Sequence, residues 1–501
     1  MSIGEKTVSG FLWTFSQQFI SLFINFLVSV LLARVMLPSQ FGLIGMIAVF
    51  VSVGEALMSG GLANSLIRTE NPDELDYSTV FFANLVMSVL IYGAVFFSAP
   101  LIARFFHNQI LIPVVRVYML CILFYALSSV PCVKLMKEMD FKRLMIYHVP
   151  SLAVSGVVGV VLAYKGFGVW SLVWMTQTQA FCYFLQFWIR SRWIPVMAFD
   201  RQRLKRHFAF GSRLLASTVL DRVYANIYNL VIGRFYSVTE LGYYTRSYSL
   251  AQIPSTNLSE ALNKVSLPAL STLQNEQERL VLAYKRIMHQ ALFIIIPVLA
   301  MMVLTAQPLF RLLLTDKWLP AVPYFRVLCL AGVLGTVNVY NLTLLLVMGK
   351  SDTYLKLNII EKVLITTGIL LVVPLGIYGL LYFQVAASIL IYLVNGRAYG
   401  RLIDYSVVRQ IRDIAPLFLI AIATGLATYG LDRWLIGAIL PGMNPGIRDF
   451  FHIALVCAFY LTVYASLFIA FKMPEMRDFN EMFLKRVTGK FFYRMSKADA
   501  I

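Results

Sequence analysis

The sequence predicts an all-α polytopic membrane protein with about 14 transmembrane helices. Its composition is 59% hydrophobic and only 14% charged, with a mean hydropathy of +0.74, whereas soluble domains average about a quarter charged residues. Apolar segments of about 20 residues, enough for a helix to cross a bilayer, recur along the whole chain. The second part of the chain also repeats the first. We therefore expect two pseudo-twofold-related six-helix lobes plus two C-terminal helices.

The expected spans follow one another with short connections. Their even number places both termini on the same side of the membrane. In order, they lie near residues 11–33, 41–64, 79–104, 111–131, 147–164, 168–189, 210–232, 241–266, 288–314, 321–346, 355–374, 377–396, 414–435 and 449–471.

The internal repeat is visible in the letters. The segment LARVMLPSQFG, which contains Arg34, matches IGRFYSVTELG, which contains Arg234, at an offset of 200. Further on, the segment at Arg116 resembles the segment at Arg326, at an offset of 210. An even number of spans in each copy keeps both copies in the same orientation, which is the parallel-repeat arrangement of some secondary transporters.

These features divide the chain into five parts. The segment between the two lobes is basic, and it either binds anionic lipid or carries only the positive charge expected of a cytoplasmic loop. The parts are an N-lobe at 1–190, a cytoplasmic linker at 191–208, a C-lobe at 209–400, two further spans at 401–473 and a basic amphipathic cytoplasmic tail at 474–501.

The charges indicate the orientation of the chain. Lys and Arg are roughly three times as frequent in one set of connections as in the other, and the richer side is cytoplasmic by the positive-inside rule. Both termini are therefore expected in the cytoplasm. The net charge of +18 reflects this topology and contact with anionic membrane lipids, and it is no sign of nucleic-acid binding.

Four of the expected spans carry polar stripes at helical spacing, two in each copy. A charge at the centre of a membrane helix costs about 2.5–3.5 kcal/mol on insertion scales, so it usually faces a protein interior or a wet cavity. Ser and Thr also occur at helix–helix contacts, so each stripe is either the face of a wet cavity or a contact between helices. The stripes are Thr14, Gln18, Ser21 and Asn25; Ser52, Glu55 and Ser59; Ser217, Asp221, Tyr224 and Tyr228; and Asn257, Glu260 and Lys264.

Familiar catalytic motifs are missing from the sequence. The Gly349-Lys350-Ser351 tripeptide lacks the first glycine of a P-loop, because Leu344 stands there. There is no HExxH or GxSxG, and the five histidines lie far apart. We therefore predict no catalytic residue, no metal site and no cofactor.

Six segments, in this order, resemble the polysaccharide transporters of the multidrug/oligosaccharidyl-lipid/polysaccharide flippase superfamily. The branch they are most similar to is the colanic-acid-exporter-like lipopolysaccharide biosynthesis proteins of bacteria. The segments are LARVMLPSQFGLIGM (32–46), MDFKRL (139–144), GFGVWSLV (166–173), IGRFYSVTELGYYTRS (232–247), DKWLPAVPYFRVLCLAG (316–332) and GKSDTYLKL (349–357).

This resemblance implies a flippase that moves an undecaprenyl-diphosphate-linked oligosaccharide from the inner to the outer leaflet of the bacterial inner membrane by alternating access. Spans one, two, seven and eight would line a central cavity, and polysaccharide polymerase machinery is an implied partner. Guanidinium groups suit a diphosphate, and tyrosines could face the sugars or lie at the membrane interface. The expected substrate-binding residues are Arg222, Arg246, Arg34, Arg234, Lys264, Asn226, Tyr224 and Tyr228, and the candidate ion-coupling residues are Glu55, Asp221 and Glu260.

Several alternatives remain open from the sequence. Arg222 could pair with a carboxylate of a neighbouring helix, and the three carboxylates could merely balance the arginines. A cation-coupled multidrug exporter of the same superfamily would need an acidic, apolar cavity, whereas this one is mixed and cationic. An O-antigen polymerase or ligase would need a large external loop. Neither the glycan nor the coupling ion can be named.

Overall fold

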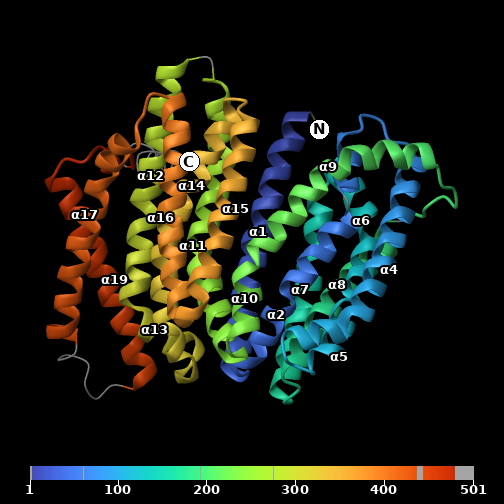
Figure 1. Ribbon diagram of the computed structural model, residues 1–501, viewed down its shortest axis with the longest axis horizontal. Coiled ribbons are helices and arrows are strands. Elements are labelled where there is room, and N and C mark those ends of the chain that lie inside the picture. The colour runs from blue at the N-terminus through green and yellow to red at the C-terminus, as the bar shows by residue number, and fades with distance from the viewer. Residues whose placement is uncertain (1–2, 60, 192, 275, 437–443, 480–501) are drawn as a thin grey trace, which may run out of the picture. The chain divides into compact units, whose positions relative to one another are not determined.

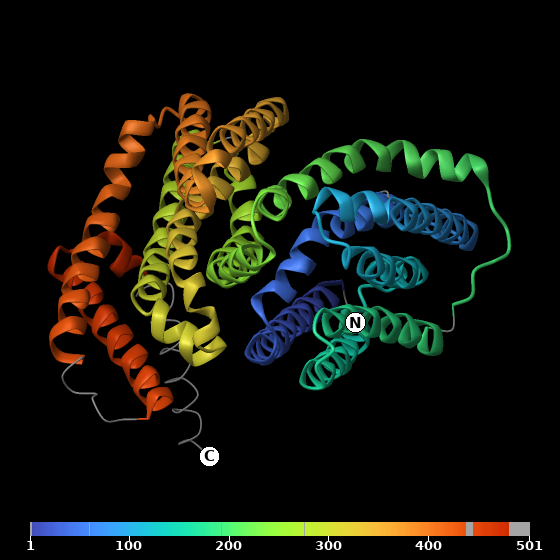
Figure 2. The ribbon, with the colours of Figure 1, turned by 60° about the horizontal axis from the view of Figure 1, so that its bottom comes forward.

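The computed structural model describes residues 3–59, 61–191, 193–274, 276–436 and 444–479 (Figures 1 and 2). Every secondary-structure element in these ranges is a helix, which confirms the predicted all-α class. The chain packs as two compact units, Met1–Thr245 and Arg246–Ile501. Their boundary lies inside a helix, so the division into lobes at a linker stays a prediction.

The first unit holds, in its described residues, ten helices and the start of an eleventh. In it, α7 packs against both α1 and α8, and α4 packs against α6. These helices are α1 (Ile3–Val35), α2 (Pro38–Ser59), α3 (Leu62–Arg68), α4 (Glu74–Phe105), α5 (Leu111–Tyr118), α6 (Cys121–Lys137), α7 (Phe141–Tyr164), α8 (Val169–Arg190), α9 (Arg201–Ala225), α10 (Ile227–Phe235) and α11 (Val238–Ser271).

The second unit continues α11 and adds the remaining helices. Within it, α14 packs between α12 and α16, and α17 packs against α12 and α19. The elements are α12 (Gln277–Leu304), α13 (Ala306–Leu314), η1 (Asp316–Ala321), α14 (Val322–Val347), α15 (Ser351–Val372), η2 (Val373–Leu375), α16 (Gly376–Leu402), α17 (Val407–Leu431), η3 (Asp432–Ile436), α19 (Pro445–Ala470) and α20 (Pro474–Phe479).

Part of the predicted linker is helical. Helix α9 begins at Arg201 because Asp200 caps it: the Asp200 carboxylate accepts hydrogen bonds from the backbone N–H groups of Gln202 at 2.7 Å and Arg203 at 3.1 Å. Residues 201–208, the last eight of the predicted linker, are therefore helical, and the role of 191–208 as a linker between lobes stays a prediction. Only residues 191–200 connect α8 to α9.

The two copies of the repeat share local hydrogen bonds. Arg116 Nε donates to the carbonyl of Phe96 at 3.2 Å, and its counterpart Arg326 donates to the carbonyl of Val303 at 3.3 Å. Each bond ties a span back to the long helix before it. Arg116 lies in the short helix α5 and Arg326 in the first turns of α14, so the repeat seen in the sequence extends to this hydrogen bond although the helices around it differ.

The starts of α2 and α11 approach each other closely and reciprocally. A Cβ atom on Gly42 would lie 1.9 Å from the carbonyl oxygen of Val238, and one on Gly242 would lie 1.9 Å from that of Pro38. Gly42 and Gly242, like Pro38 and Val238, are 200 residues apart. Each glycine therefore contacts, in the other copy, the position equivalent to the one that contacts its counterpart, as a pseudo-twofold axis requires. Only glycine permits so close an approach, because it has no Cβ atom.

The count of fourteen transmembrane spans stays a prediction. Among the described residues, ten helical segments are long and apolar enough to cross a membrane, and one of them, Ser351–Leu402, contains both α15 and α16. Helices α8, α9 and α11 are not among these ten segments. Helices α9 and α11 carry many of the charges that interrupt the apolar pattern, because they bear the predicted polar stripes.

The predicted amphipathic tail falls mostly outside the described residues. Its first segment is the short helix α20, which packs against α12. His289 Nδ1 lies 2.7 Å from a carboxylate oxygen of Glu475, and Gln290 Nε2 donates to the Glu475 carbonyl at 3.0 Å. The start of the tail is therefore held by α12, and its remainder, residues 480–501, stays a prediction.

Candidate functional site on α2, α9 and α10

The expected seventh span is broken at Asn226. Helix α9 ends at Ala225 and α10 begins at Ile227, and the N–H of Asn226 bonds to the carbonyl of Val223 rather than to that of Arg222. The Arg222 carbonyl instead accepts a hydrogen bond from the Asn226 side chain at 3.0 Å. The side-chain amide thus replaces the missing backbone donor of the break.

The same amide connects α9 to α2. Asn226 Nδ2 donates to Ser52 Oγ at 3.1 Å, and Asn229 Nδ2 donates to Asn226 Oδ1 at 3.3 Å. Ser52 belongs to the polar stripe predicted on the second span. The structure therefore joins the stripe of the second span to Asn226, which lies outside the stripe predicted on the seventh span, and both residues belong to the first unit.

Glu55 and Arg222 lie one turn from this contact on their own helices. Both side chains are exposed, and the charge of Arg222 acts on the Glu55 carboxylate through space. Within the described part of the chain, no ion pair joins Arg222 to a carboxylate. The alternative of a close structural pair for Arg222 is therefore not observed, and its guanidinium is accessible to an anion.

Three further groups that can form hydrogen bonds interact electrostatically with Glu55. The Glu55 carboxylate is within electrostatic reach of Tyr118, Cys121 and Tyr125 on α5 and α6. A carboxylate surrounded by protein but still exposed suits the binding of a small cation or a proton. This arrangement supports its candidate role in coupling without testing it.

The predicted tyrosines differ in exposure. Tyr224 and Tyr228 are half-buried, and Tyr244 is buried. The rings of Tyr228 and Tyr244 stack at 6.2 Å with an interplanar angle of 27°. Stacking occupies one face of Tyr228, and contact of Tyr224 or Tyr228 with a sugar stays a prediction.

The two repeated arginines at the helix ends have different surroundings. Arg34, in the last turn of α1, is exposed. Arg234 Nη1 donates to the Phe105 carbonyl at 2.7 Å and contacts His107, and its guanidinium lies 5.3 Å from the Phe105 ring centre. Arg234 therefore anchors α10 to the end of α4, in addition to any role in binding.

The other predicted site residues fall on α9 and α11. Asp221 is exposed on α9, and Glu260 is exposed on α11. Arg246 is buried, with 9% of its surface exposed. The side chain of Lys264 lies outside the described residues. The binding and coupling roles of all these residues remain predictions.

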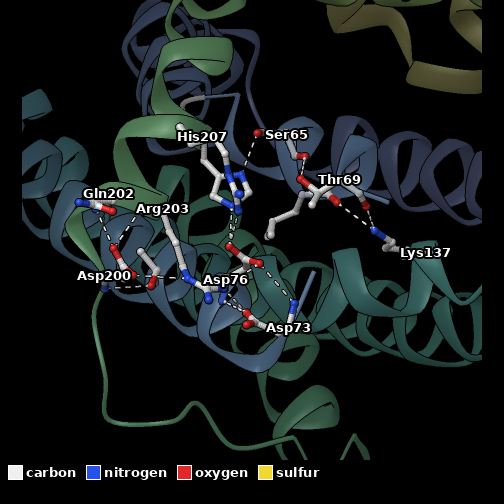
Figure 3. Close-up of polar contacts among 12 residues, drawn as sticks. Ser65, Thr69, Asp73, Asp76, Lys137, Asp200, Gln202, Arg203 and His207 are labelled. Carbon is white, nitrogen blue, oxygen red and sulfur yellow. Dashed lines mark hydrogen bonds and ion pairs between the residues drawn. The ribbon is translucent and has the colours of Figure 1, made fainter. Parts of the chain in front are cut away.

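A second polar cluster, not predicted from the sequence, joins α3 and α4 to the first turns of α9 (Figure 3). Asp76 is buried, and its carboxylate accepts from Arg206 at 2.9 Å and from Arg203 at 3.0 Å. Arg203 also pairs with Asp73, which forms a capping box with Asp76 at the start of α4. A DxxD pattern before an apolar run was the available sequence signal for this capping box.

His207 completes this cluster. Its Nδ1 lies 2.8 Å from Ser65 Oγ and its Nε2 lies 3.3 Å from Asp76 Oδ1 (Figure 3). Burial lowers the pKa of His207, and the charges of Arg206 and Arg203 act in the same direction, while Asp76 opposes them. The Ser–His–Asp order matches that of a nucleophilic triad, but all three residues are buried and Asp76 is already bound by two arginines. The cluster fastens α9 to α4.

A helical membrane bundle with a duplicated unit and polar stripes on its repeated helices has the architecture of a secondary transporter. The chain belongs to the polysaccharide biosynthesis protein family, whose sequence pattern matches residues 31–323. The predicted membership of the multidrug/oligosaccharidyl-lipid/polysaccharide flippase superfamily is thereby confirmed. It is a multi-pass membrane protein of the transporter class.

The relatives agree with this assignment. The chain is 24% identical to the lipopolysaccharide biosynthesis protein WzxC of Escherichia coli (strain K12), over 79% of this chain and 82% of that protein. It is 25% identical to the teichuronic acid biosynthesis protein TuaB of Bacillus subtilis (strain 168), over 86% and 90%. The solved structure of the lipid II flippase MurJ in an inward closed conformation matches with a TM-score of 0.72 and 13% identity, over 93% of this chain and 99% of that one. This structural match shows a shared fold.

Proposed function

We propose that the protein moves an undecaprenyl-diphosphate-linked oligosaccharide from the inner to the outer leaflet of the bacterial inner membrane by alternating access. The family, and the polysaccharide roles in the names of the relatives, support the substrate class. The observation that carries the proposal is Arg222, an exposed guanidinium with no ion pair among the described residues, beside the break in α9–α10.

The chemistry of Arg222 suits the diphosphate. A guanidinium is always charged, is planar, and can donate two parallel hydrogen bonds to phosphate oxygens. Asn226 holds the carbonyl of Arg222 and thereby fixes the local backbone. Glu55 lies close enough to act on Arg222, so protonation of Glu55, or cation binding to it, would change how strongly Arg222 attracts an anion. This links the candidate coupling site to the candidate substrate site.

The polymerase or ligase alternative finds no support in the lengths of the connections. Among the parts of the chain that the structure describes, the longest connection is the one between α8 and α9, at residues 191 and 193–200, on the side predicted to be cytoplasmic. An enzyme acting on lipid-linked sugars at the outer face usually presents a larger external loop. The transporter class of the family agrees with this interpretation.

The first test is an export assay in a deletion strain complemented with variants of Arg222. Arg222→Ala should abolish export of the polysaccharide and cause the lipid-linked repeat unit to accumulate, at unchanged protein level. Arg222→Lys should retain part of the activity, because a charge without a planar fork remains. Full export by Arg222→Ala would refute the role in diphosphate binding.

Two further variants complete the design. Arg104→Ala is the matched control, because Arg104 is exposed at the end of α4 and away from Asn226. Glu55→Gln separates the two roles of the carboxylate. If Glu55 couples transport to an ion, export by Glu55→Gln should no longer depend on the ion gradient. If Glu55 only balances charge, export by Glu55→Gln should keep that dependence.

A further inference from the structure

A groove lined almost wholly by apolar side chains lies on the outside of the first unit, where α2, α3 and α4 meet the start of α9. Its volume is about 520 Å³, within the range of about 300–1,000 Å³ typical of small-molecule sites. Val86 is 59% exposed and Leu90 63% exposed, so the groove is open along the side of α4. Its lining includes Leu57, Leu62, Ala83, Leu90, Leu204 and Phe208.

The first two turns of α9 divide into two opposite faces. Arg203, Arg206 and His207 lie on the face that bonds to Asp76 and Asp73 (Figure 3). Leu204 and Phe208 lie on the other face and line the groove. Residues 201, 204, 205 and 208 follow helical spacing of three and four, so they share this second face.

Two cations therefore share the helix face whose Leu204 and Phe208 line the apolar groove. Arg201 and Lys205 are exposed, and each stands within one helical turn of Leu204. The ion pairs of the described residues include Arg203 and Arg206 but neither Arg201 nor Lys205. A cation that holds the fold together would have a carboxylate partner, as Arg203 does, whereas these two are accessible to a ligand.

We propose that this groove is a binding site for an anionic phospholipid. One acyl chain would lie along Leu57, Ala83 and Leu204, and the phosphate would contact Arg201 and Lys205. The site is distinct from the Arg222 region, and it requires no assumption about the transported substrate. The sequence left open whether the basic segment at 191–208 binds anionic lipid or carries only the positive charge expected of a cytoplasmic loop. On this proposal the segment does both.

The charges favour an anionic over a zwitterionic occupant. A purely apolar groove would accept any acyl chain, so the cations are the feature that needs an explanation. Each Lys or Arg near an anionic surface contributes about 1 kcal/mol, a factor of about five in affinity. The predicted topology puts the start of α9 on the cytoplasmic side, where anionic lipid is attracted to basic segments.

The test measures lipid binding to the purified full chain in detergent by native mass spectrometry. Phosphatidylglycerol and phosphatidylcholine with identical acyl chains are titrated separately. The protein should bind phosphatidylglycerol about 25-fold more tightly, because two cations contribute about fivefold each. Arg201→Gln/Lys205→Gln should remove this preference. Ala83→Trp, which fills the groove, should weaken binding of both lipids, and Ala83→Leu should do so to a smaller extent without the bulk that could hinder folding.

Matched variants control for general effects. Arg401→Gln/Arg412→Gln removes two exposed cations at the ends of α16 and α17, and Ala423→Trp adds the same bulk to an exposed position of α17. Both should bind like the unmodified chain. Equal affinity for the two phospholipids, or a preference that survives Arg201→Gln/Lys205→Gln, would overturn the proposal.

A third titration distinguishes a phospholipid from the proposed substrate. Undecaprenyl phosphate is added in place of the phospholipid. If it binds more tightly than phosphatidylglycerol and loses affinity in the same variants, the occupant is a polyprenyl lipid and the phospholipid assignment is wrong. If it does not, the groove remains a phospholipid site. Arg222→Ala should leave phosphatidylglycerol binding unchanged, so failure of the proposed function and failure of this inference are distinguishable.

Discussion

Asn226 shows how a single side chain can hold a break in a helix. It supplies the donor that the Arg222 carbonyl loses, and it bonds to Ser52 on α2. A buried or membrane-embedded carbonyl without a hydrogen-bond partner costs about 1–3 kcal/mol. Because the Asn226 side chain donates to the Arg222 carbonyl in place of a backbone N–H, the break in the helix avoids this cost. Asn226 is also one of the substrate-binding residues expected from the sequence, and that role stays a prediction beside the structural role now observed.

At the same scale, His207 predicts how stability depends on pH. Its pKa in the folded chain lies below the ordinary value of 6.5 because the ring is buried and faces Arg203 and Arg206, against the attraction of Asp76. As pH falls through 6.5, the unfolded chain takes up a proton more readily than the folded chain. Thermal stability should therefore fall as the pH drops from neutral through 6.5 towards the lower, folded-state pKa, as measured by melting of the purified protein.

The contribution of His207 can be isolated by substitution. The amide of Gln can bond to Ser65 and Asp76 but does not titrate, so His207→Gln should have a flatter melting profile over this pH range. Asp73 and Asp200 do not confuse the result, since backbone N–H groups hold the pKa of each below its ordinary 3.8. An identical pH profile in His207→Gln and the unmodified chain would contradict this account.

At the scale of helices, the start of α2 and the start of α11 form one tight joint. A methyl group on Gly42 or Gly242 would meet a backbone carbonyl at 1.9 Å, and backbone cannot yield as a flexible side chain can. Gly42→Ala and Gly242→Ala should each destabilise the protein by about 1–3 kcal/mol and should reduce export. Because the two contacts are equivalent by the repeat, both variants should lower the melting temperature by a similar amount.

Glycines elsewhere provide the control. Around Gly93 in α4 and Gly335 in α14, no other part of the described chain lies within 4 Å of the point that a Cβ atom would occupy, apart from the backbone of the same helix. Gly93→Ala and Gly335→Ala should therefore be neutral or slightly stabilising. If Gly242→Ala behaved like Gly93→Ala, the starts of α2 and α11 would not pack in this way.

The sequence could predict the helices and the repeat, because both are written in local patterns. Apolar length shows a span, and the 200-residue offset between Arg34 and Arg234 shows the duplication. The cluster around Asp76 was not predictable, since its bonds join residues about 130 positions apart and follow from how α9 lies on α4. The break at Asn226 was also missed, because an amide that replaces a backbone donor leaves no mark on hydropathy.

At the scale of the whole molecule, the duplication and the charge distribution predict the same orientation of the two copies in the membrane. Each copy has an even number of expected spans, so equivalent connections should lie on one side. The turn at Phe167, between α7 and α8, corresponds to the turn at Leu375, between α15 and α16. Both turns carry few cations and are predicted to be external, whereas Met139 and Lys350 lie in connections on the predicted cytoplasmic side.

Cysteine labelling checks this orientation directly. All five native cysteines are free thiols and are first replaced by Ser, after which Phe167→Cys, Leu375→Cys, Met139→Cys and Lys350→Cys are introduced singly. Phe167 is 51% exposed and Leu375 71% exposed, so a reagent that cannot cross the membrane should label these two positions in intact cells. Met139→Cys and Lys350→Cys should react only after permeabilisation. Labelling of Phe167→Cys and Leu375→Cys from opposite sides would show that the copies are inverted, and a transporter built from two parallel units would then have to be abandoned.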